Sequence, residues 1–336
     1  MEWDHDIDLS KRKLTSQLIV RRVLARGWKI CAFKTNLAVF LIYIPGRDKP
    51  IKIMSASPPQ MSYAAVKIAK DKFITNQILN QENIPTPKEI LINSSDYNEI
   101  EIETFIKSCG VVVLKPLDAS HGKGITMNIT SLDDFRKAID EVRLYTEKNS
   151  VVLQEEVQGI DVRVLCINYK YISSISRIPA SVVGDGKHNI RELIEITNKS
   201  EDRGNNYQSK LNIIPIDKVE KYLKPDQLEN IPANGEDFQV IGVSNIGMGG
   251  IRKNVGELIP QSLIDIAIKV SEIIELPVCG VDFMIKHLPN PNSTLAELDP
   301  KLIEVNECPM LTVYEDVESV EEERVIDNYL DFVASY

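Results

Sequence analysis

Short apolar segments and helical segments follow one another in an irregular order along the chain, and this order limits the fold class. Segments rich in β-branched and aromatic residues, such as 38–44, 111–114 and 279–285, are typical of strands. Between them lie segments with apolar residues at helical spacing, such as 12–26 and 260–274. A doubly wound parallel sheet needs a regular helix–strand alternation, which this chain lacks. We therefore predict the α+β class with mixed sheets.

The chain of 336 residues is long enough for roughly two domains, at about 150 residues per domain. Residues 1–70 are expected to form a small N-terminal α/β unit, in which a helix ending at Gly27 precedes three short strands. A long helix is predicted over roughly residues 62–83, because the two prolines that follow would stop any helix. The larger domain would then cover residues 71–336.

Composition and charge exclude several classes of protein. The net charge is −10, whereas a general nucleic-acid-binding protein needs a strong basic excess. The five cysteines are scattered and form no C-x-x-C pair, so neither a disulfide framework nor a structural zinc site is expected. The longest apolar stretch, residues 37–45, is too short to span a membrane, and the acidic start lacks the apolar core of a signal peptide. We therefore expect a soluble, cytoplasmic protein with no nucleic-acid or membrane partner.

A lysine stands at the end of a hydrophobic segment, where Lys115 follows residues 111–114. Such a lysine is costly to bury unless an anion compensates its charge. The loop after it contains two glycines, a lysine and a histidine, whose backbone N–H groups and cations are suited to surround phosphate oxygens. These loop residues are His121, Gly122, Lys123 and Gly124. The alternative is an ordinary hairpin turn with Lys115 exposed to solvent, and no Gly-x-x-x-x-Gly-Lys-Ser/Thr motif supports the phosphate interpretation.

A second polar group ends the strand predicted at residues 151–155. A strand that ends in acids can accept the amino group of adenine and offer backbone groups to the ring, and an acid several residues later suits ribose hydroxyls. The residues concerned are Gln154, Glu155, Glu156 and Val157, followed by Asp161. Taken alone, this pattern fits a charged strand edge better than a nucleotide site.

Two C-terminal segments carry side chains of the kind that bind Mg²⁺. Asp282 lies in the predicted strand 279–285. Glu304 and Asn306 lie two residues apart in the predicted strand 302–306, so they share a face. Two carboxylates and an amide oxygen suit a hard cation whose remaining ligands are phosphate oxygens. The alternative is a set of buried polar groups whose partners are backbone atoms.

Taken together and in this order, the three groups of residues resemble the ATP-grasp ligases, from about residue 69 to residue 332. The resemblance is greatest to the glutathione-synthesising domain of bifunctional glutathione synthases and to the ligase part of cyanophycin synthetases. It implies an ATP-grasp fold over residues 71–336, in which two α+β subdomains grip ATP, with the glycine-loop subdomain at about 108–158. Residues 1–70 would be a pre-grasp-like unit.

The same resemblance implies a role for each group of residues. The residues that would bind ATP are Lys72, Lys115, His121, Gly122, Lys123, Gly124, Gln154, Glu155, Glu156, Val157 and Asp161. The residues that would bind the metal are Asp282, Glu304 and Asn306. Two Mg²⁺ ions are implied, with Mn²⁺ as the alternative ion and Glu304 as the bridging ligand.

The implied reaction is ATP-dependent formation of an amide or peptide bond between a carboxylate and an amine, through an acyl phosphate, on amino acids or a small peptide. Arg163, Arg177 or Arg252 would hold the acceptor carboxylate or the acyl-phosphate oxygens, since a planar guanidinium binds two oxygens at once. Lys253 follows Arg252 where the family often has acids, so the amino-acid substrate itself is not implied. The alternatives are an ATP-grasp-type phosphotransferase and a non-catalytic nucleotide-binding module. A homodimer is an open prediction.

Overall fold

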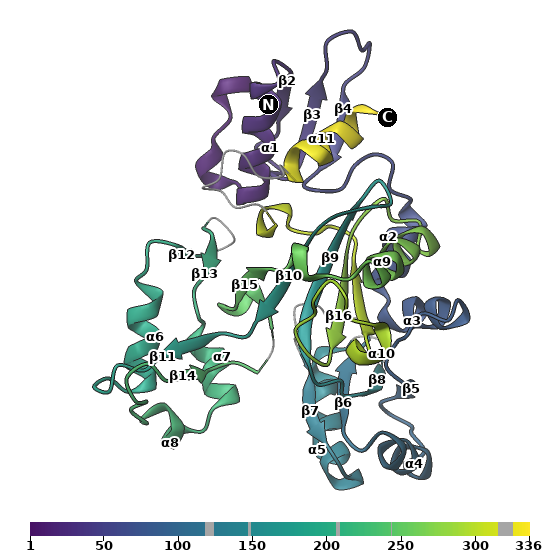
Figure 1. The fold of residues 1–336 in the computed structure, drawn as a ribbon, viewed down its shortest axis with the longest axis vertical. Helices are drawn as coiled ribbons and strands as arrows, with labels where there is room; N and C mark the ends of the chain where they lie inside the picture. The colour runs from purple at the N-terminus through teal and green to yellow at the C-terminus, as the bar shows by residue number, and fades with distance from the viewer. Residues whose placement is uncertain (118–123, 147–148, 206–208, 243, 315–324) are drawn as a thin grey trace.

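Figure 1 shows the computed structural model, which describes residues 1–117, 124–146, 149–205, 209–242, 244–314 and 325–336. Helices cover antiparallel sheets, and one short strand pair in the described ranges is parallel. The α+β class predicted from the sequence is therefore confirmed. Within those ranges, no helix is both long enough and apolar enough to cross a membrane.

The N-terminal unit, at the top of Figure 1, is a four-stranded antiparallel sheet with a helix packed on it. Helix α1 (Leu14–Ala25) ends before Gly27, whose φ of 69° lies in the left-handed region that favours glycine. The strands are, in order across the sheet, β1 (Glu2–Trp3), β2 (Lys29–Ala32), β3 (Val39–Tyr43) and β4 (Ile51–Met54). The helix and the three strands that the sequence predicts here are thus confirmed.

The last helix of the sequence, α11 (Val325–Ala334), packs on this N-terminal unit (Figure 1). Arg26 at the end of α1 donates hydrogen bonds to Asp327 Oδ1 at 3.0 and 3.2 Å and to Asp331 Oδ1 at 2.6 Å. One cluster of buried apolar side chains joins both elements to Leu165, far away in the sequence. Residues on the two sides of the predicted boundary at residue 70 therefore share a core, and the boundary itself stays a prediction.

Two helices follow where the sequence predicts one. Helices α2 (Tyr63–Lys70) and α3 (Lys72–Gln81) are separated by Asp71, which has an extended backbone. The Asp71 side chain accepts a hydrogen bond from the N–H of Ile74 at 3.0 Å and so caps α3. The single long helix predicted here is therefore wrong, because an aspartate inside a helical pattern begins a new helix.

A four-stranded antiparallel sheet with two helices occupies the lower right of Figure 1. Its strands are, in order across the sheet, β5 (Glu89–Asn93), β8 (Ser150–Glu155), β6 (Val112–Pro116) and β7 (Thr126–Ile129). Helices α4 (Glu99–Cys109) and α5 (Leu132–Val142) pack on one face through a buried cluster that includes Phe135 and Leu153. The strands predicted at 111–114 and 151–155 are confirmed by β6 and β8.

The central sheet has five antiparallel strands, and its two faces pack against different parts of the molecule. In order across the sheet the strands are β15 (Ile251–Asn254), β10 (Lys170–Ile178), β9 (Ile160–Ile167), β16 (Val278–Ile285) and β17 (Lys301–Asn306). Val162 and Val164 of β9 pack toward helix α9 (Gln261–Ile273), whereas Leu165 packs into the core of the N-terminal unit. Ile167, Ile175 and Val278 lie on this second face and join the same core as Leu165. Charged side chains lie on the same face, beyond these apolar residues.

A smaller lobe, at the lower left of Figure 1, lies between β10 and β15 in the sequence. Its elements are β11 (Ser181–Val183), α6 (Ile190–Asn198), β12 (Arg203–Gly204), β13 (Leu211–Asn212), α7 (Ile216–Tyr222), α8 (Pro225–Leu228) and β14 (Asp237–Gln239). Strand β11 pairs with β14, strand β12 pairs with β13, and the lobe has a buried apolar cluster of its own. Helix α10 (Leu295–Leu298) lies between β16 and β17 in the sequence.

Candidate active site

Lys115 is buried at the end of β6, with 7% of its surface exposed. Its Nζ donates a hydrogen bond to Gln154 Oε1 on β8 at 2.7 Å. Gln154 Nε2 donates in turn to Glu89 Oε2 on β5 at 2.6 Å, and Asn76 Nδ2 of α3 donates to the same oxygen at 2.9 Å. The interpretation in which Lys115 is exposed to solvent is therefore wrong, and a chain of polar groups joins three strands to a helix.

The charge of Lys115 is influenced by groups on several elements. Burial and, to a smaller extent, the positive charge of Lys72 lower the pKa of the Lys115 ammonium to about 8, while the carboxylates of Glu89 and Glu304 oppose this. Burial also raises the pKa of Glu89. Lys72 and Glu304 therefore lie close enough to act on Lys115. An ammonium that burial destabilises in this way gains from binding an anion.

One face of the central sheet carries a row of charged side chains from neighbouring strands. Asp282 on β16 lies opposite Arg163 on β9 and accepts hydrogen bonds from Arg163 Nε at 2.5 Å and Nη2 at 2.7 Å. Arg177 on β10 donates to both oxygens of Asp161 at 2.7 Å and, from Nη2, to Asp282 Oδ2 at 2.7 Å. Because each buried carboxylate has an arginine partner, the charges of the row compensate one another.

The protonation of this row follows from burial and from the two arginines. Burial alone would raise the pKa of Asp282, but Arg163 and Arg177 outweigh it and hold that pKa below its ordinary value. Burial raises the pKa of Asp161 to about 6, against the lowering effect of Arg177. Burial disfavours the charged arginines, yet the carboxylates outweigh it and raise their pKa values. The row is therefore ionised at neutral pH.

Glu304 and Asn306 on β17 continue the same face, as their spacing predicts. Glu304 lies opposite Asp282, and a β-bulge next to this pair turns Leu302 to the apolar face of the sheet. Lys72 Nζ, at the start of α3, lies 3.5 Å from Glu304 Oε1. The bulge thus allows an apolar and an acidic residue, two apart in sequence, to face opposite ways.

The donors at this edge fit a hard divalent cation in part. The side chain of Glu304 is 35% exposed, and Asn306 Nδ2 is buried with no hydrogen-bond partner among the described residues. Both oxygens of Asp282, by contrast, already accept arginine hydrogen bonds. In the described ranges, no group of three or more His, Cys, Asp and Glu side chains is arranged to hold a metal ion. The carboxylate of Glu304 is thus the accessible oxygen ligand at this edge, with Asp282 opposite it and Asn306 on the same face.

The acidic end of β8 is tied to backbone groups of its neighbours. Glu155 Oε2 accepts a hydrogen bond from Lys88 N at 3.1 Å, and Glu156 Oε2 accepts one from Asn128 N at 2.7 Å. Gln154 instead points into the Lys115 network. Binding of adenine at this strand end stays a prediction.

Arg252 on β15 lies directly opposite Arg177, and therefore beside the charged row. Its Nη1 donates to the carbonyl of Lys210 at 3.1 Å and its Nη2 to the carbonyl of Thr312 at 3.5 Å. The structure thus brings the three arginines of the predicted site onto one face of the sheet.

Part of the predicted phosphate loop, namely His121, Gly122 and Lys123, lies outside the described residues. Gly124 is described, with a φ of 70°. A Cβ at this position would lie 2.8 Å from the Cβ of Tyr145, so no larger residue fits without a shift.

Three polar residues near these networks are absent from the sequence-based site. Glu89 is the first residue of β5, and Asn76 lies within helix α3, where it looks like any residue of an amphipathic helix. Tyr314 follows the 3-10 helix Leu311–Val313, and its buried hydroxyl has no hydrogen-bond partner in the described part of the chain. No pattern in the sequence points to Tyr314.

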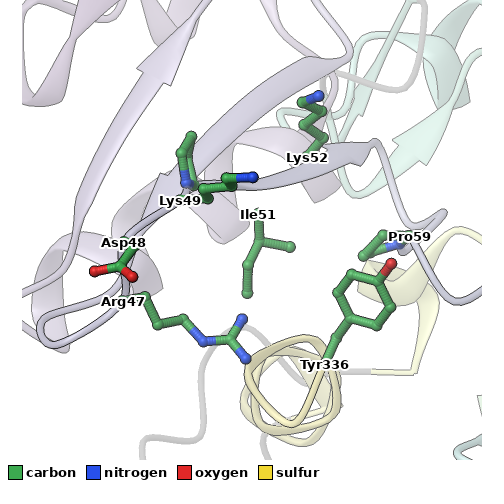
Figure 2. Close-up of a pocket in the computed structure, with 8 residues that line it drawn as sticks. Arg47, Asp48, Lys49, Ile51, Lys52, Pro59 and Tyr336 are labelled. Atoms are coloured by element: carbon green, nitrogen blue, oxygen red, sulfur yellow. The ribbon is translucent and has the colours of Figure 1, made fainter.

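A pocket of about 500 Å³ lies on the N-terminal unit, away from these networks (Figure 2). It is bordered by the turn before β4, by β4 itself, by Pro59 and by Tyr336. Ile51 points into it between Arg47 and Tyr336. No residue of the predicted site lines this pocket.

Comparisons with known proteins agree with this geometry. The family model for the ATP-grasp domain of prokaryotic glutathione synthetase matches residues 84–205. A cyanophycin synthetase from Geminocystis herdmanii is 34% identical over 250 residues, which is 73% of this chain and 28% of that protein. A glutathione biosynthesis bifunctional protein from Listeria monocytogenes is 26% identical over 327 residues, which is 96% of this chain and 41% of that protein. The chain thus spans less than half the length of these relatives.

Solved structures share the fold. A bifunctional glutathione synthetase from Pasteurella multocida has a TM-score of 0.69 and 21% identity, covering 97% of this chain and 44% of its own. D-alanine–D-alanine ligase from Bacillus anthracis has a TM-score of 0.50 and 15% identity, covering 81% of this chain and 69% of its own. The matched domain, the similar sequences and the common fold together place this chain in the ATP-grasp family.

Proposed function

We propose that the protein is an ATP-dependent ligase that joins a carboxylate to an amine through an acyl phosphate. The observation that carries this proposal is the meeting of two networks, in which Lys115 and Lys72 lie beside the acidic edge at Glu304. Cations next to hard oxygen ligands are what a Mg²⁺–triphosphate complex requires. The similar proteins, which include a cyanophycin synthetase and a D-alanine–D-alanine ligase, support substrates of the amino-acid or small-peptide class.

The triphosphate is proposed to lie between β6 and the charged face of the central sheet. Lys115 and Lys72 donate to its oxygens, and the anion removes the cost of burying the Lys115 ammonium. The backbone at residues 154–157 binds adenine in this proposal. Asp161 binds the ribose, which requires its carboxylate to share the hydrogen bonds that it now accepts from Arg177.

Mg²⁺ is proposed to bind at Glu304 and Asn306, with Asp282 as the third ligand. When bound, the ion offsets the charge of the triphosphate. The accessible carboxylate of Glu304 supports this placement, and Asn306 lies two residues further along β17, on the same face. Two ions are proposed, with Glu304 as the ligand that they would share. Asp282 would have to lose one of its hydrogen bonds from Arg163 or Arg177 to become a ligand.

In the proposed reaction, a carboxylate oxygen of the substrate attacks the γ-phosphorus of ATP, and ADP leaves with the electron pair of the broken P–O bond. The amine then attacks the carbonyl carbon of the acyl phosphate, phosphate leaves, and the amine loses a proton. Arg163 and Arg177 hold phosphoryl or carboxylate oxygens, because each planar guanidinium binds two oxygens. A closed site excludes water, which would hydrolyse the acyl phosphate.

The acceptor is proposed to carry an additional carboxylate. Arg252 lies next to the charged row, whereas Lys253, the next residue of β15, faces the opposite side of the sheet. An acidic amino acid or a peptide C-terminus matches the charge of Arg252. A cytoplasmic location and a homodimer stay predictions from the sequence.

The decisive experiment traps the acyl phosphate. Pairs of amino acids and dipeptides are screened for ATP-dependent phosphate release, and an active carboxylate is then incubated with ATP, Mg²⁺ and hydroxylamine. A ligase yields the hydroxamate of that carboxylate together with ADP. ADP with a phosphorylated alcohol or histidine and no hydroxamate would identify a phosphotransferase, and nucleotide binding without ADP release would identify a binding module.

A further inference from the structure

The pocket on the N-terminal unit has an apolar floor and apolar walls (Figure 2). Ile51 of β4 forms the floor, and 4% of its surface is exposed because it belongs to the buried cluster that also includes α11. Pro50 and Pro59 border the pocket, and the ring of Tyr336 lies across it from Arg47. The volume of about 500 Å³ falls within the range of small-molecule sites, about 300–1,000 Å³.

Hydrogen bonds hold the walls of this pocket in place. Gln60, the residue after Pro59, donates from Nε2 to the carbonyl of Phe332 in α11 at 3.1 Å. Tyr336 is joined to the end of the same helix, where its N–H donates to the carbonyl of Val333 at 3.4 Å. Strand β4, which carries the floor, pairs with β3. The pocket is therefore formed without a ligand, so binding costs little ordering of the protein.

Two cations border this apolar space. Figure 2 shows the guanidinium of Arg47 below Ile51 and the ammonium of Lys49 above it, whereas the carboxylate of Asp48 is turned away from Ile51. Lys52 follows Ile51 on β4, so its side chain points to the other side of the sheet. In the part of the chain that the structure describes, neither Arg47 nor Lys49 has an ion-pair partner. In a protein with a net charge of −10, two such cations beside an apolar pocket indicate an anionic ligand.

We propose that this pocket binds a small organic anion that carries an aromatic ring. The acidic group of the ligand, a carboxylate or a phosphate, accepts hydrogen bonds from Arg47 and Lys49, and the planar guanidinium can bind two of its oxygens at once. The ring of the ligand lies against Ile51 and against the phenol ring of Tyr336, which is 66% exposed. None of these residues belongs to the proposed nucleotide site, so the inference does not depend on the proposed function.

The probe is anilinonaphthalene sulfonate, an aromatic anion whose fluorescence rises in an apolar site. It is titrated into the protein in the presence of excess MgADP, which keeps it from the proposed nucleotide site. Arg47→Ala removes a charge-assisted hydrogen bond and is expected to weaken binding of the probe about tenfold or more. Tyr336→Ala removes the ring contact and is expected to weaken it about threefold or more. Both residues are exposed, so both variants should fold, and circular dichroism checks this.

Arg21→Ala is the matched control, because Arg21 is an exposed arginine of α1 in the same unit and does not line the pocket. This variant should bind the probe like the unmodified protein. Unchanged binding in either pocket variant would overturn the proposal, and an equal loss in Arg21→Ala would reduce it to a general attraction by positive charge.

Competition then tests the chemical class of the ligand. Displacement of the probe by uridine monophosphate supports a phosphate as the acidic group, and displacement by phenylacetate supports a carboxylate. Displacement by neither compound would show that the proposed class of ligand is wrong. Equal displacement by inorganic phosphate, which has no ring, would show that the pocket does not recognise the ring, and this too would overturn the proposal.

Discussion

At the scale of single residues, the ammonium of Lys115 is removed from water and donates a hydrogen bond to a neutral group, the amide oxygen of Gln154. In this hydrogen-bonded network the nearest carboxylate is that of Glu89, which accepts a hydrogen bond from Gln154 and none from Lys115. Among the residues that the structure describes, this buried cation therefore has no directly bonded anion. A negatively charged ligand would supply the anion that Lys115 lacks, and the affinity for this ligand should therefore depend on pH.

The affinity for ATP is expected to fall as the pH rises through about 8, the pKa of Lys115 in the free protein. Below this pH Lys115 is charged and binds phosphate. Above it the side chain must first take up a proton, and the free energy of this protonation weakens ATP binding. The fall should approach about tenfold per pH unit, because one proton is taken up on binding. Calorimetric titrations of ATP between about pH 7 and pH 9 measure it.

Lys115→Ala should bind ATP more weakly at neutral pH and lose most of this slope. Lys70→Ala is the control, because Lys70 is exposed and paired with Glu307 at 3.2 Å, and it should keep both the affinity and the slope. A slope that survives in Lys115→Ala would mean that another group takes up the proton.

Glu304→Gln is expected to reduce turnover severely and to raise the Mg²⁺ concentration needed for half-maximal rate. The substitution removes one negative charge from a hard oxygen site and also releases Lys72. Steady-state rates at varied Mg²⁺ measure the effect, with circular dichroism as the check on folding. Glu307→Gln, just after the same strand, should behave like the unmodified enzyme. Full activity of Glu304→Gln at limiting Mg²⁺ would refute the metal assignment.

At the scale of elements, the start of α3 decides where Lys72 lies. Asp71 caps the helix, and Lys72 is its first residue. Asp71→Ala should lower the free energy of unfolding by about 1 kcal/mol, as loss of an N-cap does, and should also raise the KM for ATP. Ser131→Ala removes the equivalent cap of α5, far from Lys72 in the sequence, and should lower stability alone. Equal KM values for ATP in the two variants would show that the Asp71 cap does not position Lys72 for ATP binding.

The same elements show how far the sequence predicts this molecule. Strands β6, β8 and β16 have continuous apolar segments and were predicted nearly to the residue, and with them the approximate places of Lys115 and Asp282. The break at Asp71 was missed, because its capping bond is local and interrupts a helical pattern without a glycine or proline. The bond between Gln154 and Glu89 joins residues 65 positions apart. Only the pairing of β5 with β8 brings these two together, and no single-sequence pattern encodes that pairing.

At the scale of the whole molecule, one apolar cluster joins the N-terminal unit, α11 and the central sheet. Leu330→Ala in α11 should therefore lower the free energy of unfolding by about 2–5 kcal/mol, as urea denaturation measures. The chain's two tryptophans, Trp3 and Trp28, both lie in the N-terminal unit, so their fluorescence should change together with far-UV circular dichroism. Ile100→Ala, at an exposed position, should shift stability by less than about 0.5 kcal/mol. Two separate transitions would indicate that the shared cluster does not couple the parts.

The bond between Arg26 and Asp327 joins residues 301 positions apart, and this separation has a consequence for the protein during its synthesis. A ribosome adds about 5–20 residues per second, so roughly 15–60 s pass between the appearance of α1 and that of α11. During this interval the apolar side chains of the N-terminal unit that pack against α11 stay uncovered. Chaperones that bind exposed apolar segments have this surface available until translation reaches the last helix.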